Sequence, residues 1–164
     1  MIETSDKLIE TIQASGFKAC IVVTGGGSGA VHALLSHPGA SRFVLEAQVP
    51  YNPRAMFDYL GEKLEQHSSK EAAEIMVLRA YERALMLTLP DGFDVPILGI
   101  ACTAALQTNR ERKGEDRAYI CIKSRRREIV RKIDLEPGSR IQQESVLSEA
   151  LLNLIAEFVG DQNP

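Results

Sequence analysis

Glycines crowd the segment that follows the first apolar run of the chain. The run Ala19–Val23 leads into Thr24-Gly25-Gly26-Gly27-Ser28-Gly29, and helix-compatible residues follow from Ala30. A strand that breaks into glycines and continues as a helix exposes backbone N–H groups at the helix N-terminus, where anions such as phosphates bind. The alternative is a tight strand-to-helix crossover without a ligand. We predict a ligand site at this loop, formed by Thr24, Gly25, Gly26, Gly27 and Ser28.

Two hydroxyl groups near predicted strand ends are further candidates for chemistry. Ser28 lies in the glycine loop, where its hydroxyl serves either as a nucleophile or as the N-cap of the following helix. Thr103 follows a predicted central strand, so its hydroxyl either reaches a ligand or satisfies a local backbone group. We include Ser28 and Thr103 in the predicted ligand site.

An aromatic and a cationic side chain complete the predicted site. Tyr51 either holds a ligand ring or assists proton transfer, or else closes the core beside Pro50. Arg140 begins the last predicted helix, where a guanidinium binds phosphate in a bidentate manner or is simply solvated. Glu46 lies among apolar residues, so either burial raises its pKa, as in a general base, or strand alternation points it to solvent.

The elements that must position these residues alternate between strands and helices. The sequence predicts an α/β domain of three layers, α/β/α, with a mixed, largely parallel central sheet. Loops after Val23, Val49 and Cys102 would then share one edge of the sheet. Apolar runs predict strands at 17–23, 42–49, 95–102, 118–122 and 128–133, the last two as a hairpin. Periodicity and capping residues predict helices at 5–14 with Ser5 as N-cap, 29–35, 53–60, 70–89 with Ser68 or Ser69 as N-cap, and 140–159.

Composition limits the compartment and the partners. The 164 residues carry a net charge of −3, which argues against a nucleic-acid partner. Cys20, Cys102 and Cys121 are widely spaced within apolar runs, as expected for buried free thiols rather than a zinc site. With no apolar run of membrane-spanning length and no basic head at the N-terminus, we expect a cytoplasmic protein.

Two charged segments are expected to be exposed turns or loops at the surface. Arg125–Arg127 form a basic run without interleaved aromatic residues, which is typical of a solvated turn between strands. The polar residues 107–116 predict an exposed loop, and within it 109–114 are candidates for a lid over a ligand.

Several motifs in order along the chain resemble a known family. Thr24-Gly25-Gly26, Pro38-Gly39-Ala40-Ser41 and Val49-Pro50-Tyr51-Asn52 resemble the C-terminal domain of the competence-damage-inducible protein CinA. The segments 68–73 and 99–104 resemble two later motifs of that family, so the resemblance spans most of the chain. It implies one CinA C-terminal-like domain over residues 1–164. The family includes nicotinamide-mononucleotide amidohydrolases.

The same resemblance places apolar residues where the family carries its chemistry. Val22 aligns with the serine associated with amide hydrolysis, and Met56 aligns with the lysine expected five positions after Tyr51. An amidase needs a nucleophile and a group to deprotonate it, and valine and methionine supply neither. The glycine-rich stretch that follows Thr-Gly in the family is also replaced, here by residues 105–110.

Three functions follow from these observations. The first is a CinA-like module that binds a nucleotide or related phosphorylated metabolite without standard deamidase chemistry. The second is an amide hydrolase, acting on nicotinamide mononucleotide or another substrate through relocated groups such as Ser28 and Tyr51. The third is a structural role in a homo-oligomer, since the apolar face of the last helix, which includes Ile141 and Val146, can bury a subunit interface. No cofactor is expected for any of them.

Overall fold

A five-stranded mixed sheet forms the middle of the protein. The computed structural model describes residues 2–92, 94–109 and 114–161. Within them the strand order is β2-β1-β3-β4-β5, with β1 parallel to β2 and β3, and with β4 antiparallel to β3 and β5. The strands are β1 (Lys18–Thr24), β2 (Val44–Gln48), β3 (Ile97–Ala105), β4 (Arg117–Lys123) and β5 (Glu128–Asp134). The predicted strands, including the late hairpin, are confirmed.

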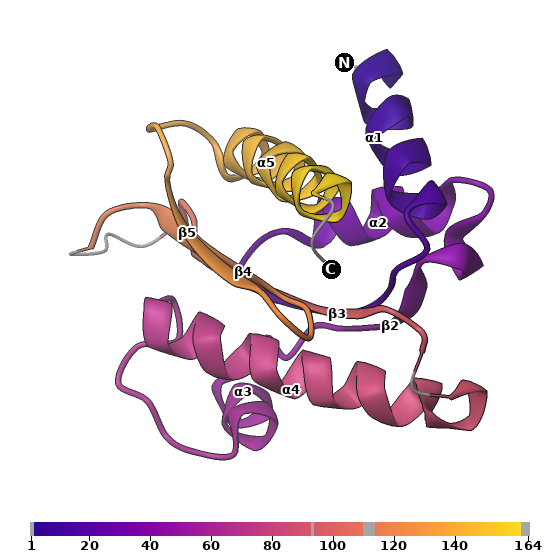
Figure 1. The fold of residues 1–164 in the computed structure, drawn as a ribbon. Coiled ribbons are helices and arrows are strands. Elements are labelled where there is room, and N and C mark those ends of the chain that lie inside the picture. Colours follow the sequence, from indigo (N-terminus) through magenta and orange to yellow (C-terminus); the bar gives the residue numbers. More distant parts are fainter. Residues whose placement is uncertain (1, 93, 110–113, 162–164) are drawn as a thin grey trace.

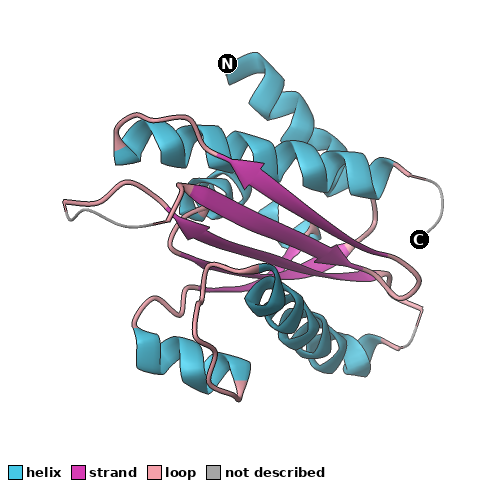
Figure 2. Cartoon of the chain, turned by 90° about the vertical axis from the view of Figure 1, so that its left-hand side faces the viewer, coloured by secondary structure: helices cyan, strands magenta, loops and turns pink. Residues whose placement is uncertain are grey.

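Helices cover both faces of this sheet, which confirms the predicted three layers. Figure 1 shows α1, α2 and α5 on one face and α3 and α4 on the other, and Figure 2 shows the same layers from the side. The helices are α1 (Ile2–Ala14), α2 (Ser28–Ser36), α3 (Pro53–Leu60), α4 (Lys70–Thr88) and α5 (Arg140–Gly160). In the described part of the chain, none of them is long and apolar enough to cross a membrane.

The central strands are apolar on both sides because each side faces a helical layer. Every residue of β3 from Ile97 to Ala104 is buried. Side chains alternate along a strand, so Val23 and Cys102 belong to the core beneath α1, α2 and α5, whereas Val22 and Ala101 belong to the core beneath α3 and α4. Because β1 is parallel to β2 and β3, the carboxyl ends of these three strands lie at the same edge of the sheet.

Side-chain caps fix where the helices near this edge begin. Asn52 accepts a hydrogen bond from the backbone N–H of Arg54, with Pro53 as the first residue of α3. Ser69, rather than Ser68, caps α4. Ser139 and Gln142 form a reciprocal capping box that starts α5.

Two predictions about element ends were wrong, those that concern Ser5 and Arg42. Helix α1 begins at Ile2, so Ser5 lies inside the helix and is not its N-cap. Arg42 belongs to a short 3-10 turn, Ala40–Arg42, and β2 starts only at Val44. In α5 the buried stripe runs through positions 143, 147, 151 and 155, four residues apart, which leaves Ile141 and Val146 outside the core and exposed.

Candidate functional site

The glycine loop, residues 24–29, borders a hollow of about 280 Å³ at the carboxyl end of β1. Its wall also includes residues that follow β2 and residues of the first turns of α5, so the three chain segments meet there. We call it the glycine-loop hollow. Six of the eight residues predicted for the ligand site line it: Thr24, Gly25, Gly26, Ser28, Tyr51 and Arg140. The residues that sequence reasoning missed are Val23, Val49, Ile141 and Glu144.

Each of the first glycines has an intramolecular reason to lack a side chain. Gly25 has a φ of +75°, and a Cβ on it would lie 2.0 Å from the carbonyl oxygen of Ala104 in β3. Gly27 has a φ of +98° and ends the loop as the N-cap of α2. Both the backbone conformation and the close approach of β3 therefore require glycine, independently of any ligand.

Side chains of helix α5 approach the other side of the loop closely. A Cβ on Gly26 would lie 2.9 Å from Cδ2 of Leu147, and a Cβ on Gly29 would lie 2.6 Å from Oγ of Ser148. The glycines thus let α5 pack directly on the strand-to-helix crossover. This packing is the crossover alternative that the sequence left open, and it accounts for the glycine run.

A carboxylate from α5 occupies the N-terminus of α2. Oε1 of Glu144 accepts a hydrogen bond from the backbone N–H of Gly27 at 2.8 Å, and Oε2 accepts a longer one from Gly29 at 3.4 Å. The hydroxyl of Ser148 also donates to Oε2 of Glu144. A negative charge is favourable at a helix N-terminus. The sequence predicted an anion at the N-terminus of this helix, and in the structure that anion is the carboxylate of Glu144 rather than a bound ligand.

Glu144 had a recognisable pattern in the sequence. Positions 144, 148, 151 and 155 are three or four residues apart, so the carboxylate lies beside the apolar stripe of the last helix. A carboxylate at the border of a buried stripe needs hydrogen-bond partners. Which backbone groups would provide them depends on the packing of α5 against a loop 117 residues away in the sequence.

Ser28 is the first residue of α2 and is exposed. The interpretation of Ser28 as the N-cap was wrong, because Gly27 is the cap and the glutamate carboxylate takes the role of a capping side chain. The Ser28 side chain lines the glycine-loop hollow instead.

Arg140 links the loops that surround the hollow. Its Nη2 donates to the carbonyl oxygen of Gly25 at 3.0 Å and to Oη of Tyr51 at 3.2 Å, and its Nη1 donates to the carbonyl oxygen of Gln107 at 3.2 Å. Tyr51 remains 65% exposed, so the ring is not a core residue beside Pro50. The guanidinium and the phenol together form the outer wall of the hollow.

The two threonine hydroxyls at this edge are committed to neighbouring loops. Oγ1 of Thr24 donates to the carbonyl oxygen of Pro50 at 3.0 Å, which fixes the segment after β2. Oγ1 of Thr103 donates to the carbonyl oxygen of His67 at 2.5 Å, and Thr103 is buried. The structure therefore does not bring Thr103, or the buried Gly27, to the wall of the hollow.

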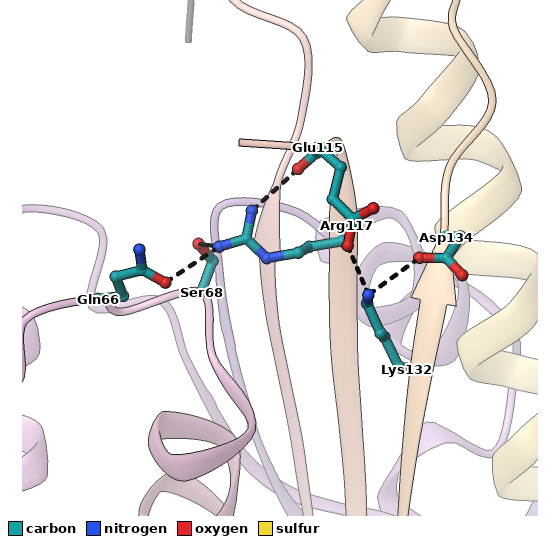
Figure 3. Close-up of polar contacts among 6 residues, drawn as sticks. All are labelled: Gln66, Ser68, Glu115, Arg117, Lys132 and Asp134. Carbon is teal, nitrogen blue, oxygen red and sulfur yellow. Dashed lines mark hydrogen bonds and ion pairs between the residues drawn. The ribbon is translucent and has the colours of Figure 1, made fainter. Parts of the chain in front are cut away.

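The loop before α4 is held from a second side by Arg117 at the start of β4 (Figure 3). Its Nη2 lies 3.4 Å from Oε1 of Gln66 and 3.3 Å from Oγ of Ser68, and its Nη1 donates to the carbonyl oxygen of Glu115 at 2.9 Å. Lys132 pairs with the Glu115 carboxylate at 2.5 Å. Arg117 thus anchors the same loop as Thr103, in a scaffolding role.

Glu46 is an ion-pair residue rather than a buried base. Its two carboxylate oxygens accept from Nε and Nη2 of Arg83 at 2.9 and 3.1 Å. This bidentate hydrogen bonding, with a further bond from Gln48, lowers the pKa of the Glu46 carboxyl below its usual value. Of the two alternatives for Glu46, the structure excludes the raised pKa, because a guanidinium from α4 reaches the half-buried strand.

The positions aligned with the family's serine and lysine lie in an apolar core. Val22 and Met56 are both fully buried, and both belong to the cluster beneath α3 and α4. Neither residue lines the glycine-loop hollow.

Thiol and metal chemistry find no support in the described residues. The three cysteines are buried and free, as predicted. Burial raises the pKa of Cys20 to about 11 and that of Cys121 to about 12, and it raises the pKa of Cys102 further, so all three thiols stay protonated near neutral pH. Among the described residues, no group of three or more histidine, cysteine or carboxylate side chains is placed to hold a metal ion.

The structure tests the prediction for the basic run 125–127 but not the one for the lid at 109–114. Arg125 and Arg126 are exposed in the turn between β4 and β5, whereas Arg127 packs its guanidinium 4.0 Å from the ring centre of Phe158 and pairs with Asp161. The lid predicted for residues 109–114 falls largely on 110–113, which lie outside the described residues.

Comparison with known proteins identifies the fold. No family model and no curated sequence matches the chain. A competence/damage-inducible protein from Agrobacterium tumefaciens superimposes with a TM-score of 0.73 at 18% identity, covering 97% of this chain and 94% of that one. A competence or damage-inducible protein from Enterobacter asburiae gives 0.68 at 16% identity, covering 96% and 95%. A CinA superfamily protein from Escherichia coli gives 0.69 at 16% identity, covering 94% and 86%.

These matches confirm the resemblance at the level of the fold. The chain has the α/β/α fold of the competence-damage-inducible CinA proteins, over nearly its whole length. With identities of 14 to 18% it is a divergent sequence on that fold.

Proposed function

We propose that this chain is a single CinA-like domain that binds a nucleotide or a related phosphorylated metabolite in the glycine-loop hollow. The observation that carries the proposal is the convergence of six predicted residues on that one hollow, from the ends of β1 and β2 and the start of α5. Ligands of α/β proteins collect at this edge of a sheet.

The walls of the hollow suit a molecule with a ring and polar substituents. Val49 and Ile141 provide apolar surface, and the exposed ring of Tyr51 offers a stacking face. The guanidinium of Arg140 at the outer wall retains N–H groups beyond its three acceptors, and these suit a phosphate. A volume of about 280 Å³ fits part of a nucleotide rather than a long cofactor.

The same geometry favours binding over hydrolysis. An amide hydrolase needs a nucleophile next to a base. Ser28 and Tyr51 line the same hollow, which keeps the hydrolase as the second candidate. The carboxylate in the wall, Glu144, already accepts hydrogen bonds from two backbone N–H groups and one hydroxyl, so its oxygens are committed to the crossover rather than to Ser28 or Tyr51.

We also propose that the protein forms a homo-oligomer, through a surface on α4 rather than through the apolar face of the last helix that the sequence indicated. Most apolar residues of α5 are buried in the core of the chain itself. The outer side of α4 instead presents exposed apolar residues, Leu78, Leu85, Met86 and the adjoining Leu89. Light scattering of the wild type and of a Leu85→Glu, Met86→Glu variant tests this surface.

We also propose the cytoplasm as the location, supported by three free, buried thiols that suit a reducing compartment.

Thermal unfolding with a panel of mononucleotides, including nicotinamide mononucleotide, tests the proposed function. A ligand at a hundred times its Kd adds about 2.7 kcal/mol to the free energy of unfolding. We expect a rise in Tm with at least one nucleotide, its loss in Tyr51→Ala, and no ammonia release from nicotinamide mononucleotide.

Two serines at opposite ends of α2 provide a matched control. Ser28 lines the hollow, whereas Ser36 is exposed at the far end of the helix, where its hydroxyl donates a hydrogen bond to the carbonyl oxygen of His32. Ammonia release that disappears in Ser28→Ala but persists in Ser36→Ala would establish the hydrolase and overturn the binding-only proposal. If no nucleotide changes Tm, the ligand proposal fails and the structural role is favoured.

A further inference from the structure

Glu144 is the least expected residue of the glycine-loop hollow. It is half-buried, it lines the hollow, and its carboxylate lies on the backbone N–H groups of Gly27 and Gly29. These two groups belong to the N-terminus of α2, a helix of nine residues. The position that would attract a ligand phosphate therefore already contains one negative charge.

The carboxylate is held in place from its own helix. Ser148 lies one turn further along α5 and donates its hydroxyl to Oε2 of Glu144. A Cβ on Gly29 would lie 2.6 Å from Oγ of Ser148, so this hydroxyl lies close to the first turn of α2. The charge cannot withdraw without breaking three hydrogen bonds, two of them to buried or half-buried glycines.

A second anion at this position would meet like-charge repulsion. Like charges placed side by side in an interface cost several kcal/mol, which corresponds to a large loss of affinity. The cationic group of the hollow is Arg140, which lies one turn before Glu144 on α5 and turns its guanidinium to Tyr51 and to the carbonyl oxygen of Gly25.

We propose that Glu144 determines the ligand specificity of the hollow by acting as a built-in anion. It excludes phosphate from the N-terminus of α2 and leaves the guanidinium of Arg140 as the position for the phosphate of a phosphorylated ligand. The inference rests on the proposed function for the class of ligand. It assigns specificity by repulsion, the means by which many sites reject a competing ligand.

Inorganic phosphate is a probe that needs no knowledge of the natural ligand. We expect phosphate at constant ionic strength to leave the amide NMR signals of Gly27 and Gly29 unchanged in the wild type. The variants Glu144→Ala and Glu144→Gln are expected to bind phosphate at least about tenfold more tightly, because the repulsion is removed and the helix N-terminus is freed. In amide NMR spectra of Glu144→Ala, phosphate is expected to shift the signals of Gly27 and Gly29.

Glu149→Gln is the matched control, since it removes the same charge from an exposed position of the same helix. Equal phosphate affinity in the wild type and both Glu144 variants would overturn the inference. A gain in Glu149→Gln as large as in Glu144→Gln would also overturn it, because net charge alone would then explain the effect.

The result is separable from the test of the proposed function. If nucleotides bind the wild type and Tyr51→Ala abolishes binding, the proposed function stands whatever phosphate does. If no nucleotide binds but removal of Glu144 creates phosphate binding at the two glycines, the repulsive role of Glu144 stands and the proposed ligand class fails.

Discussion

Strand β1 and the glycine loop that follows it lie in opposite kinds of surroundings. Val22 points into the core beneath α3 and α4, where it is fully buried in the same cluster as Met56. Two residues later the chain enters the glycine loop, where the carboxylate of Glu144 lies between α2 and α5. The apolar side of this comparison is the core around Val22, and the polar side is the crossover next to the hollow.

The difference shows how backbone polar groups shape a site. Inside β1 the N–H and C=O groups are satisfied by β2 and β3, so apolar side chains suffice. At the crossover the ladder stops, and the N–H groups of α2 need another acceptor. The chain supplies it from α5. A glycine-rich turn on this fold therefore does not by itself indicate that a ligand covers its backbone.

Gly25→Ala is expected to have the largest effect on this comparison. The substitution combines a left-handed backbone, at about 1–2 kcal/mol, with overpacking against Ala104, at about 1–3 kcal/mol, so we expect the free energy of unfolding to fall by about 4 kcal/mol. Chemical denaturation measures the change. Gly16 has a φ of +84°, and a Cβ added there would meet no atom within 4 Å, so Gly16→Ala isolates the backbone contribution and should cost about 1 kcal/mol. Equal losses would contradict the close packing of β3 on the loop.

Met56→Ala tests the apolar side. Met56 is fully buried, so the lost burial and the remaining cavity should lower the free energy of unfolding by about 3 kcal/mol. Ile141→Ala is the comparison, because this side chain is 83% exposed and its truncation should change stability by less than about 0.5 kcal/mol. A small effect at Met56 would mean that this core is not tightly packed.

Glu144→Ala tests the polar side. Removing the carboxylate leaves the N–H of Gly27 and the hydroxyl of Ser148 without their acceptor, which should cost about 2 kcal/mol in denaturation experiments. Glu149→Ala, from an exposed position, should change stability by less than about 0.5 kcal/mol. If the two variants are equally stable, the carboxylate does not hold the crossover.

Glu46→Gln is expected to have the smallest effect, under about 1 kcal/mol, because the ion pair with Arg83 is partly exposed. The pKa of Glu46 is lower in the folded protein than the ordinary glutamate value of 4.5. Its contribution is therefore present above pH 4.5 and is lost as the pH falls through the folded pKa. Denaturation of both proteins across this range should show the difference shrinking in acid, and a difference that grows there would contradict the ion pair.

The sequence by itself determined the order and type of the elements. Continuous apolar runs predicted β1 and β3 because a strand covered on both faces needs no polar side. The serines before α4 and the proline in α3 marked helix starts because capping chemistry is local. The alternation of strands and helices predicted that the loops after Val23 and Val49 share one sheet edge, where Thr24 and Tyr51 line the same hollow.

Only the tertiary structure decided what the glycine loop is for. Local patterns cannot show that the backbone of Ala104 approaches Gly25 closely enough to require glycine, or that the side chains of Leu147 and Ser148 pack against the loop. Nor can they pair Glu144 with Gly27 or Glu46 with Arg83, since these contacts join distant segments through the docking of whole helices. Hydrogen-bond partners and pKa values depend on such long-range packing, whereas strand and helix patterns depend on neighbours along the chain.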